Sequence, residues 1–125
     1  MTNDLQKLLV ANGDSLRECI AAINANGKRI ALVVDSEQRL SGTVTDGDIR
    51  RAILDNISLE ETVGKLLDQK TGTKYAQPIT AYQDDSRTEF LALMQEHNAS
   101  HLPVVDQDGR VVDMVMLDQL VAKKD

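Results

Sequence analysis

The sequence predicts an α/β (α+β) fold in which one small unit, a mixed three-stranded sheet with two helices, occurs twice. Residues 14–45 and 85–116 align without a gap at a constant offset of 71 residues, and nine aligned positions carry identical residues. Both segments also show the same order of patterns, namely a helix, a strand, a polar turn and a second strand. A repeat of this length indicates two copies of one supersecondary unit, each too small to bury its apolar face alone. We therefore expect the copies to pack about a pseudo-two-fold axis, with a cleft between them.

The composition fits one compact domain or one module of a longer chain, and it excludes several classes of function. The chain has 125 residues, 42% of them hydrophobic, which is enough for a core. Its net charge of −6 argues against a nucleic-acid partner, which requires a basic face. No apolar run approaches the ~20 residues of a membrane span, so we expect no membrane association. The one cysteine, Cys19, lies among the apolar positions of a predicted helix, so we expect a buried thiol in a reducing, cytoplasmic setting.

The first copy begins with a short strand and a well-marked helix. The short strand is expected at 8–10. Ser15 and Glu18 have the spacing of a capping box, which predicts a helix start at this point. Gly27 can adopt the left-handed conformation that ends a helix. The remaining elements are predicted as a strand at 30–34, a strand at 39–45 and a helix at 46–54.

The second copy repeats these signals. Ser86 and Glu89 form its capping box, and Asn98 takes the place of Gly27 at the helix end. Its other elements are predicted as strands at 79–81, 101–105 and 110–116 and a helix that begins at 118.

These signals divide the chain into three segments. We place the first copy at 1–54, a linker with a short helix at 55–77, and the second copy at 78–125. Within the linker, Ser58 and Glu61 have the spacing of a third capping box, and the segment carries no residues that suggest chemistry.

The residues with the clearest potential to bind a ligand lie where the predicted strand 39–45 meets the next helix. Unpaired N–H groups and the dipole at a helix N-terminus favour a phosphate, and Thr45 adds a hydroxyl. Asp48 can accept both hydroxyls of a ribose, and Gly47 lets a ligand approach the backbone. Arg50 and Arg51 follow at once and can reach a phosphate. The alternative interpretation is an ordinary helix cap, because Thr and Asp are common in caps.

The doubled pattern resembles the CBS (cystathionine-β-synthase) domain pair, also called a Bateman module. The resemblance rests on three runs, ALVVD at 31–35, GTVTDGDI at 42–49 and HLPVVD at 101–106, and it covers nearly the whole chain. It implies a regulatory module without catalysis of its own, which binds an adenosine ligand such as AMP or ATP in the cleft between its repeats. Some pairs of this kind bind S-adenosylmethionine or NADH instead.

The resemblance also assigns roles to individual residues. Thr45 would contact the phosphate and Asp48 the ribose, while Ile30 and Ala31 would border the base. His101 opens a strand that faces the expected cleft, so it is a further candidate, although a strand-end histidine without a ligand is the simpler interpretation.

The second copy departs from the pattern. Met116 corresponds to Thr45 in the alignment of the two copies. Asp118 is taken as the counterpart of Asp48, although one residue fewer separates it from Met116 than separates Asp48 from Thr45. Asp113 replaces the glycine at position 42, where an acidic group would repel phosphate. We therefore expect one nucleotide site per chain.

Catalysis and metal binding find no support in the sequence. His97 and His101 have the spacing of helical metal ligands, but the predicted helix ends between them and no third ligand is near. No serine has a histidine and an acid placed to activate it. We expect a non-catalytic module with no catalytic residue and no metal.

The run TDGDIRRAIL at 45–54, with MLDQL at 116–120, is most similar to CBS pairs fused ahead of sugar-phosphate nucleotidyltransferases. Arabinose-5-phosphate isomerases carry a similar TDGD run. The resemblance therefore implies the N-terminal module of a nucleotidyltransferase, fused to its catalytic domain, with a sugar-phosphate isomerase as one alternative. The other alternative is a structural dimerisation module without a ligand. In each case we expect a homodimer, formed by helices around 49–54 and 87–97.

Overall fold

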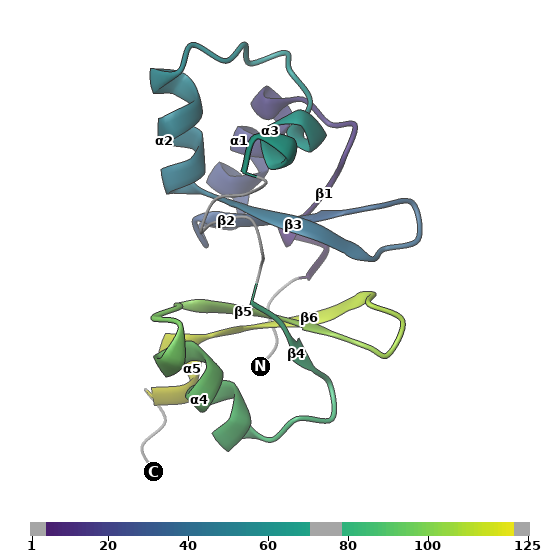
Figure 1. The fold of residues 1–125 in the computed structure, drawn as a ribbon, viewed down its shortest axis with the longest axis vertical. Coiled ribbons are helices and arrows are strands. Elements are labelled where there is room, and N and C mark those ends of the chain that lie inside the picture. Colours follow the sequence, from purple (N-terminus) through teal and green to yellow (C-terminus); the bar gives the residue numbers. More distant parts are fainter. Residues whose placement is uncertain (1–4, 71–78, 122–125) are drawn as a thin grey trace. The chain divides into compact units, whose positions relative to one another are not determined.

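The computed structural model describes residues 5–70 and 79–121, which form two compact units (Figure 1). One unit is built mainly from residues 6–70 and the other from 79–121. Each contains one three-stranded mixed sheet with helices on one of its faces, so the predicted α/β architecture is confirmed.

The first unit has the strand order β1-β2-β3. Strand β1 is parallel to β2, and β2 is antiparallel to β3. Figure 1 shows α1, α2 and α3 on the same side of this sheet. The elements are η1 (Leu5–Leu8), β1 (Leu9–Ala11), α1 (Leu16–Asn26), β2 (Ile30–Val34), β3 (Leu40–Thr45), α2 (Asp46–Leu54) and α3 (Val63–Lys70).

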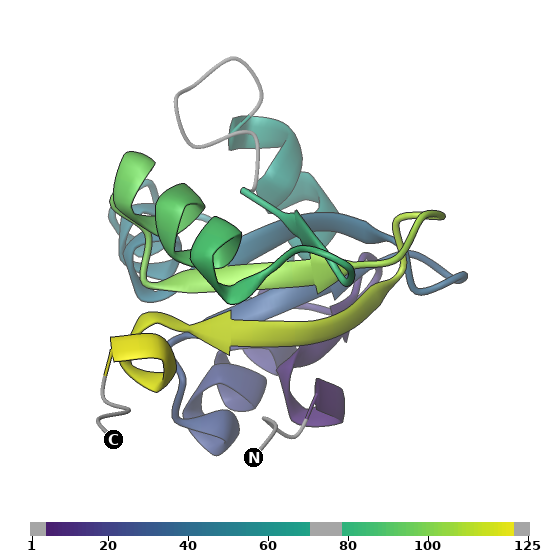
Figure 2. The same ribbon diagram turned by 90° about the horizontal axis from the view of Figure 1, so that it is seen from below.

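The second unit repeats this topology with the strand order β4-β5-β6. Its helices α4 and α5 contact each other, and each contacts the sheet. Figure 2 shows α4, in green, lying along the strand β5 that it contacts. The elements are β4 (Ala81–Tyr82), α4 (Arg87–Glu96), β5 (His101–Val105), β6 (Val111–Met116) and α5 (Leu117–Val121).

The strand registers of the two units match residue by residue. Val10 pairs with Val33 in the first unit, and Ala81 pairs with Val104 in the second, at the same offset of 71. Each central strand also carries a register shift at one equivalent step, 33/34 in β2 and 104/105 in β5. The sequence repeat is therefore a structural repeat, whereas the two-fold relation between the units and the boundaries at 54 and 78 remain predictions.

Two of the identical residue pairs of the repeat cap helices. The Ser15 hydroxyl accepts from the Glu18 amide at 3.0 Å, and the Glu18 carboxylate accepts from the Ser15 amide at 2.8 Å. Ser86 and Glu89 make the same reciprocal pair at 3.1 and 2.7 Å. Both predicted capping boxes are confirmed.

Turns repeat in the same way. Gly27 ends α1 with a φ of 68°, and Asn98 follows α4 with a φ of 53°, so both helix ends use the predicted left-handed conformation. In the first hairpin one oxygen of Asp35 accepts from two backbone amides at 2.8 and 3.0 Å. Asp106 does the same in the second hairpin at 2.9 and 3.0 Å. Aspartate is preserved at these positions because its side chain closes the turn.

The first residues of α3 are hydrogen-bonded to the loop between β1 and α1. The amides of Val63 and Gly64 donate to Asp14 and Asn12 carbonyls at 2.8 and 2.9 Å. The third predicted capping box is wrong, because the Ser58 hydroxyl accepts from Glu60 at 3.1 Å in a turn that precedes the helix. Thr62 stands before the first helical residue instead, and its hydroxyl accepts from Lys65 at 3.3 Å.

Each unit has its own core. In the first unit Val63 and Leu66 of α3 pack with buried residues of α1, β2 and β3. Cys19 of α1 is fully buried in this cluster, and burial is the main reason that the pKa of its thiol rises to about 11. The predicted buried thiol is confirmed. In the described residues, no helix combines the length and the apolar character needed to cross a bilayer.

Candidate functional site

The site predicted from the sequence is built on the junction between β3 and α2. Thr45 is the N-cap of α2, with extended backbone angles and a hydroxyl that accepts from the Asp48 amide at 3.3 Å. In return, Asp48 Oδ2 accepts from the Thr45 amide at 2.9 Å and from its hydroxyl at 3.2 Å. This is a capping box with aspartate in the place of the usual glutamate. The shorter side chain draws the carboxylate close to the helix end, where it is only 5% exposed.

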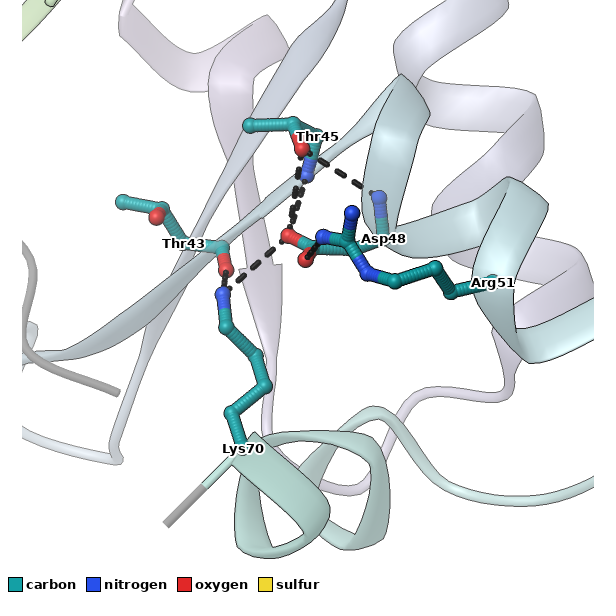
Figure 3. Close-up of polar contacts among 5 residues, drawn as sticks. All are labelled: Thr43, Thr45, Asp48, Arg51 and Lys70. Atoms are coloured by element: carbon teal, nitrogen blue, oxygen red, sulfur yellow. Dashed lines mark hydrogen bonds and ion pairs between the residues drawn. The ribbon is translucent and has the colours of Figure 1, made fainter. Parts of the chain in front are cut away.

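Two cations converge on this carboxylate from different helices (Figure 3). The Arg51 guanidinium, one turn further along α2, donates to Asp48 Oδ1 at 2.5 Å. The Lys70 ammonium, from the last residue of α3, lies 3.1 Å from Asp48 Oδ2 and donates to the Thr43 carbonyl at 2.8 Å. The lysine side chain is 14% exposed and that of the arginine 48%. The inner part of the site therefore joins one carboxylate to two positive charges.

The ionisation of Asp48 follows from these neighbours. Burial raises the pKa of its carboxyl, but the hydrogen bond from the Thr45 backbone and the charge of Lys70 lower that pKa by more. The net pKa lies below the ordinary value of 3.8. Asp48 is therefore a carboxylate at neutral pH and can accept hydrogen bonds from a ligand's hydroxyl groups.

A cavity of about 200 Å³ opens between α2 and α3 and reaches this cluster. An apolar cavity of about 150 Å³ holds a benzene molecule, and drug-sized ligands occupy ~300 Å³ or more. The cavity therefore has room for part of a nucleotide, such as its sugar. Its lining residues are Asp48, Arg51, Ala52, Asp55, Ile57, Leu66, Gln69 and Lys70.

The other predicted site residues differ in their surroundings. Ile30 and Ala31 are buried in β2, at 3% and 0% exposure, so their side chains already belong to the core. Arg50 is exposed on α2 and is not among the cavity's lining residues. A Cβ at Gly47 would meet only ordinary contacts, the nearest 3.5 Å away, so the unbound fold does not require glycine there. His101 opens β5 in the other unit and is half-buried.

The equivalent position of the second unit lacks the charged residues of the Thr45–Asp48 site. Sequence spacing suggested Asp118 as the counterpart of Asp48, and this assignment is wrong. Gln119 Oε1 accepts from the Met116 amide at 3.0 Å, as Asp48 accepts from Thr45. A neutral amide thus replaces the carboxylate, and Met116 provides no hydroxyl.

Sequence reasoning missed Lys70 and Gln119 for different reasons. Gln119 lies 71 residues after Asp48, so the constant offset of the repeat could have identified it. Lys70 carries no such signal, because α3 falls outside the repeated segments and its approach to Asp48 depends on tertiary packing.

No metal centre is evident in the part of the chain that the structure describes. Within residues 5–70 and 79–121, no three histidine, cysteine, aspartate or glutamate side chains gather as metal ligands would.

Comparison with known proteins places the chain in a family. The model of the CBS domain matches residues 1–55 and 73–124. A probable arabinose 5-phosphate isomerase of Haemophilus influenzae is 32% identical over 98 residues, which are 78% of this chain and 27% of that protein. The chain spans about a third or less of the length of the first curated relatives that it matches.

Solved structures share the fold at lower identity. A CBS domain protein from Pyrobaculum aerophilum, complexed with AMP, superposes with a TM-score of 0.78 at 18% identity, over 99% of this chain and 93% of that one. The cytosolic domain of the Mg²⁺ channel MgtE, in complex with ATP, gives a TM-score of 0.73 at 22% identity, over 92% of this chain and 44% of that one. With the family match over both repeats, these similarities confirm the predicted domain pair: the chain belongs to the CBS domain family.

Proposed function

We propose that this CBS pair is a regulatory module that senses an adenine nucleotide through the Thr45–Asp48 capping box. The observation that carries the proposal is the ionised, nearly buried Asp48 carboxylate, which lines a cavity together with Arg51 and Lys70. The AMP and ATP complexes of structural neighbours support the ligand class.

In this proposal each residue has a defined task. Asp48 accepts the ribose hydroxyls, and the Thr45 hydroxyl and the first amides of α2 face the phosphate. Arg51, with Arg50 behind it, adds positive charge for the phosphate. Ile30, Ala31, Gly47 and His101 stay as predicted neighbours of the ligand. Ligand that binds one arrangement of the module better than another shifts the balance between them, and an attached domain responds to that shift.

The attached domain is proposed to act on sugar phosphates. The runs at 45–54 and 116–120 favour a nucleotidyltransferase, with this chain as its N-terminal module. The isomerase of Haemophilus influenzae, 32% identical to this chain, favours the second candidate, a sugar-phosphate isomerase. In both cases the module itself carries no catalysis and works in the cytoplasm.

A panel of ligands tests the proposal. AMP and ATP, at about a hundred times the dissociation constant, should stabilise the fold by about 2.7 kcal/mol. Thermal unfolding with adenine, guanine and cytidine nucleotides, S-adenosylmethionine and sugar phosphates measures this. Asp48→Asn should weaken binding by about ten- to a hundredfold, because it removes a charged acceptor. The matched variant Gln119→Ala should leave affinity unchanged, and calorimetry should give one site per chain.

Two results would contradict the proposal. Equal losses of affinity in the Asp48 and Gln119 variants would show that the site lies elsewhere. No stabilisation by any nucleotide would favour the alternative, a structural dimerisation module.

Dimer formation through α2 is a separate prediction. Ile53 and Leu54 expose 55% and 74% of their surface at the end of this helix, and exposed apolar side chains of this size favour an interface. We expect a homodimer that also uses α4, over 87–97, and Leu54→Glu should weaken it at least tenfold. Light scattering against concentration measures the change, with Lys65→Glu as a control on another helix. A wild-type monomer at high micromolar concentration would rule this dimer out.

A further inference from the structure

Lys70 is held in the site by contacts that a solvated helix end would not make. It is the last residue of α3, yet its ammonium donates to β3 at Thr43 and to the carboxylate of Asp48 on α2. Its side chain is 14% exposed, whereas that of Lys65 on the same helix is 58% exposed and pairs with Glu61. Figure 3 shows Lys70 extending from α3 to the capping box.

The acceptor capacity of Asp48 is already in use in this structure. Among the described residues, its carboxylate accepts four hydrogen bonds, two from Thr45 and one each from Lys70 and Arg51. An ionised carboxylate offers about four lone-pair positions. Three of these bonds fall on Oδ2 and one, from Arg51, on Oδ1, so Oδ2 has no position left. A ribose diol, which donates two hydroxyls, must therefore displace at least one donor that is already in place.

The donors differ in how easily they can leave. The bond from the Thr45 amide is part of the cap of α2, so breaking it frays the helix. The bonds from Lys70 and Arg51 come from long side chains whose rotamers can change. Displacing Lys70 leaves an ammonium in a mostly buried place without its carboxylate, which is costly unless another anion takes over.

We infer that Lys70 makes this site select phosphorylated ligands over the corresponding nucleosides, an inference that rests on the proposed function. A nucleoside takes the Asp48 carboxylate away from Lys70 and offers nothing in return. A nucleotide brings a phosphate on the same sugar, to which the displaced ammonium can turn, and such a charge-assisted pair is strong. Because α3 has no counterpart in the repeated segments, this selection belongs to the first unit.

The test compares AMP with adenosine by calorimetry on the wild type, Lys70→Met and Lys65→Met. The wild type should bind AMP more tightly than adenosine. In Lys70→Met the ratio of the two dissociation constants should fall at least tenfold, because AMP loses a partner and adenosine no longer displaces one. Lys65→Met should keep the wild-type ratio. Lys70→Arg, which retains a cation, should restore most of it.

The outcomes separate this inference from the proposed function. If AMP binding depends on Asp48 while the ratio is unchanged in Lys70→Met, the inference is overturned and the proposed function stands. If neither ligand binds to the wild type or to any variant, both are overturned. Should Lys70→Met fail to fold by circular dichroism, Lys70→Gln retains a donor for the Thr43 carbonyl without the charge, and the same ratio decides.

Discussion

Replacing Asp48 with alanine should lower the free energy of unfolding by about 3 kcal/mol, the largest effect we expect from a polar substitution in this chain. The change removes the Asp48 half of the α2 capping box and leaves Lys70, which is mostly buried, without its carboxylate. Arg51 contributes less, because its half-exposed side chain can turn to solvent. Chemical denaturation of the ligand-free protein measures the effect.

The acid side of the stability profile gives a second readout for Asp48. Its folded pKa is lowered, so the carboxylate stabilises the protein fully above the unfolded pKa of about 3.9 and loses that contribution as the pH falls further. The gap between wild type and Asp48→Ala should stay constant from pH 7 to pH 5 and narrow below about pH 4. Gln119→Ala, the equivalent change in the second unit, should cost only about 1 kcal/mol at any of these pH values, because it removes one hydrogen bond to a backbone amide. If the two variants lost the same free energy of unfolding at pH 7, the ion pairs of Asp48 with Lys70 and Arg51 would not be the cause of its larger expected effect.

Gly42→Asp should also destabilise the protein by about 3 kcal/mol, although Asp113 occupies the equivalent position of the second unit. A Cβ on Gly42 would lie 2.9 Å from Leu67 Cδ2, beneath α3. Alanine would force only a shift of the leucine methyl groups and should cost about 1 kcal/mol. Aspartate would add a charge that faces the apolar side chain of Leu67.

The reverse exchange is the control. Asp113 is half-buried, and its Oδ1 accepts from the Met114 amide at 2.8 Å, so the second unit accommodates a carboxylate. Asp113→Gly should therefore lower the free energy of unfolding by only about 1 kcal/mol, because it removes one hydrogen bond. Similar losses in both exchanges, measured by denaturation, would mean that α3 does not decide which residue fits at this position.

Local chemistry explains what the sequence could predict. Capping boxes, left-handed helix ends and aspartate-closed turns each depend on only a few neighbouring residues. Ser15, Gly27 and Asp35 therefore predict a helix start, a helix end and a turn without information on the rest of the fold. The constant offset then transfers these assignments to the second unit. The sequence also predicts the Thr45–Asp48 pair as a candidate, because Thr and Asp at this spacing fit both a helix cap and a ligand-binding site.

The rest depended on packing between elements distant in the chain. Lys70 lies 22 residues from Asp48, and nothing in its neighbours shows that its ammonium will reach the cap of another helix. Ser58 illustrates the opposite case, since its local pattern is correct for a helix start but the chain uses it in a turn. The helix starts after Thr62 instead, where the amides of Val63 and Gly64 pair with the β1–α1 loop.

That pairing has a consequence for the order in which the protein can mature during synthesis. A nascent chain that has left the ribosome only as far as residue 54 contains every strand of the first sheet. It still lacks Val63 and Leu66, which complete the core, and Lys70, which forms an ion pair with the Asp48 carboxylate. Stable folding of the first unit should therefore wait until α3 has emerged, and a truncation between the two points should yield a protease-sensitive chain despite containing a full copy of the repeat.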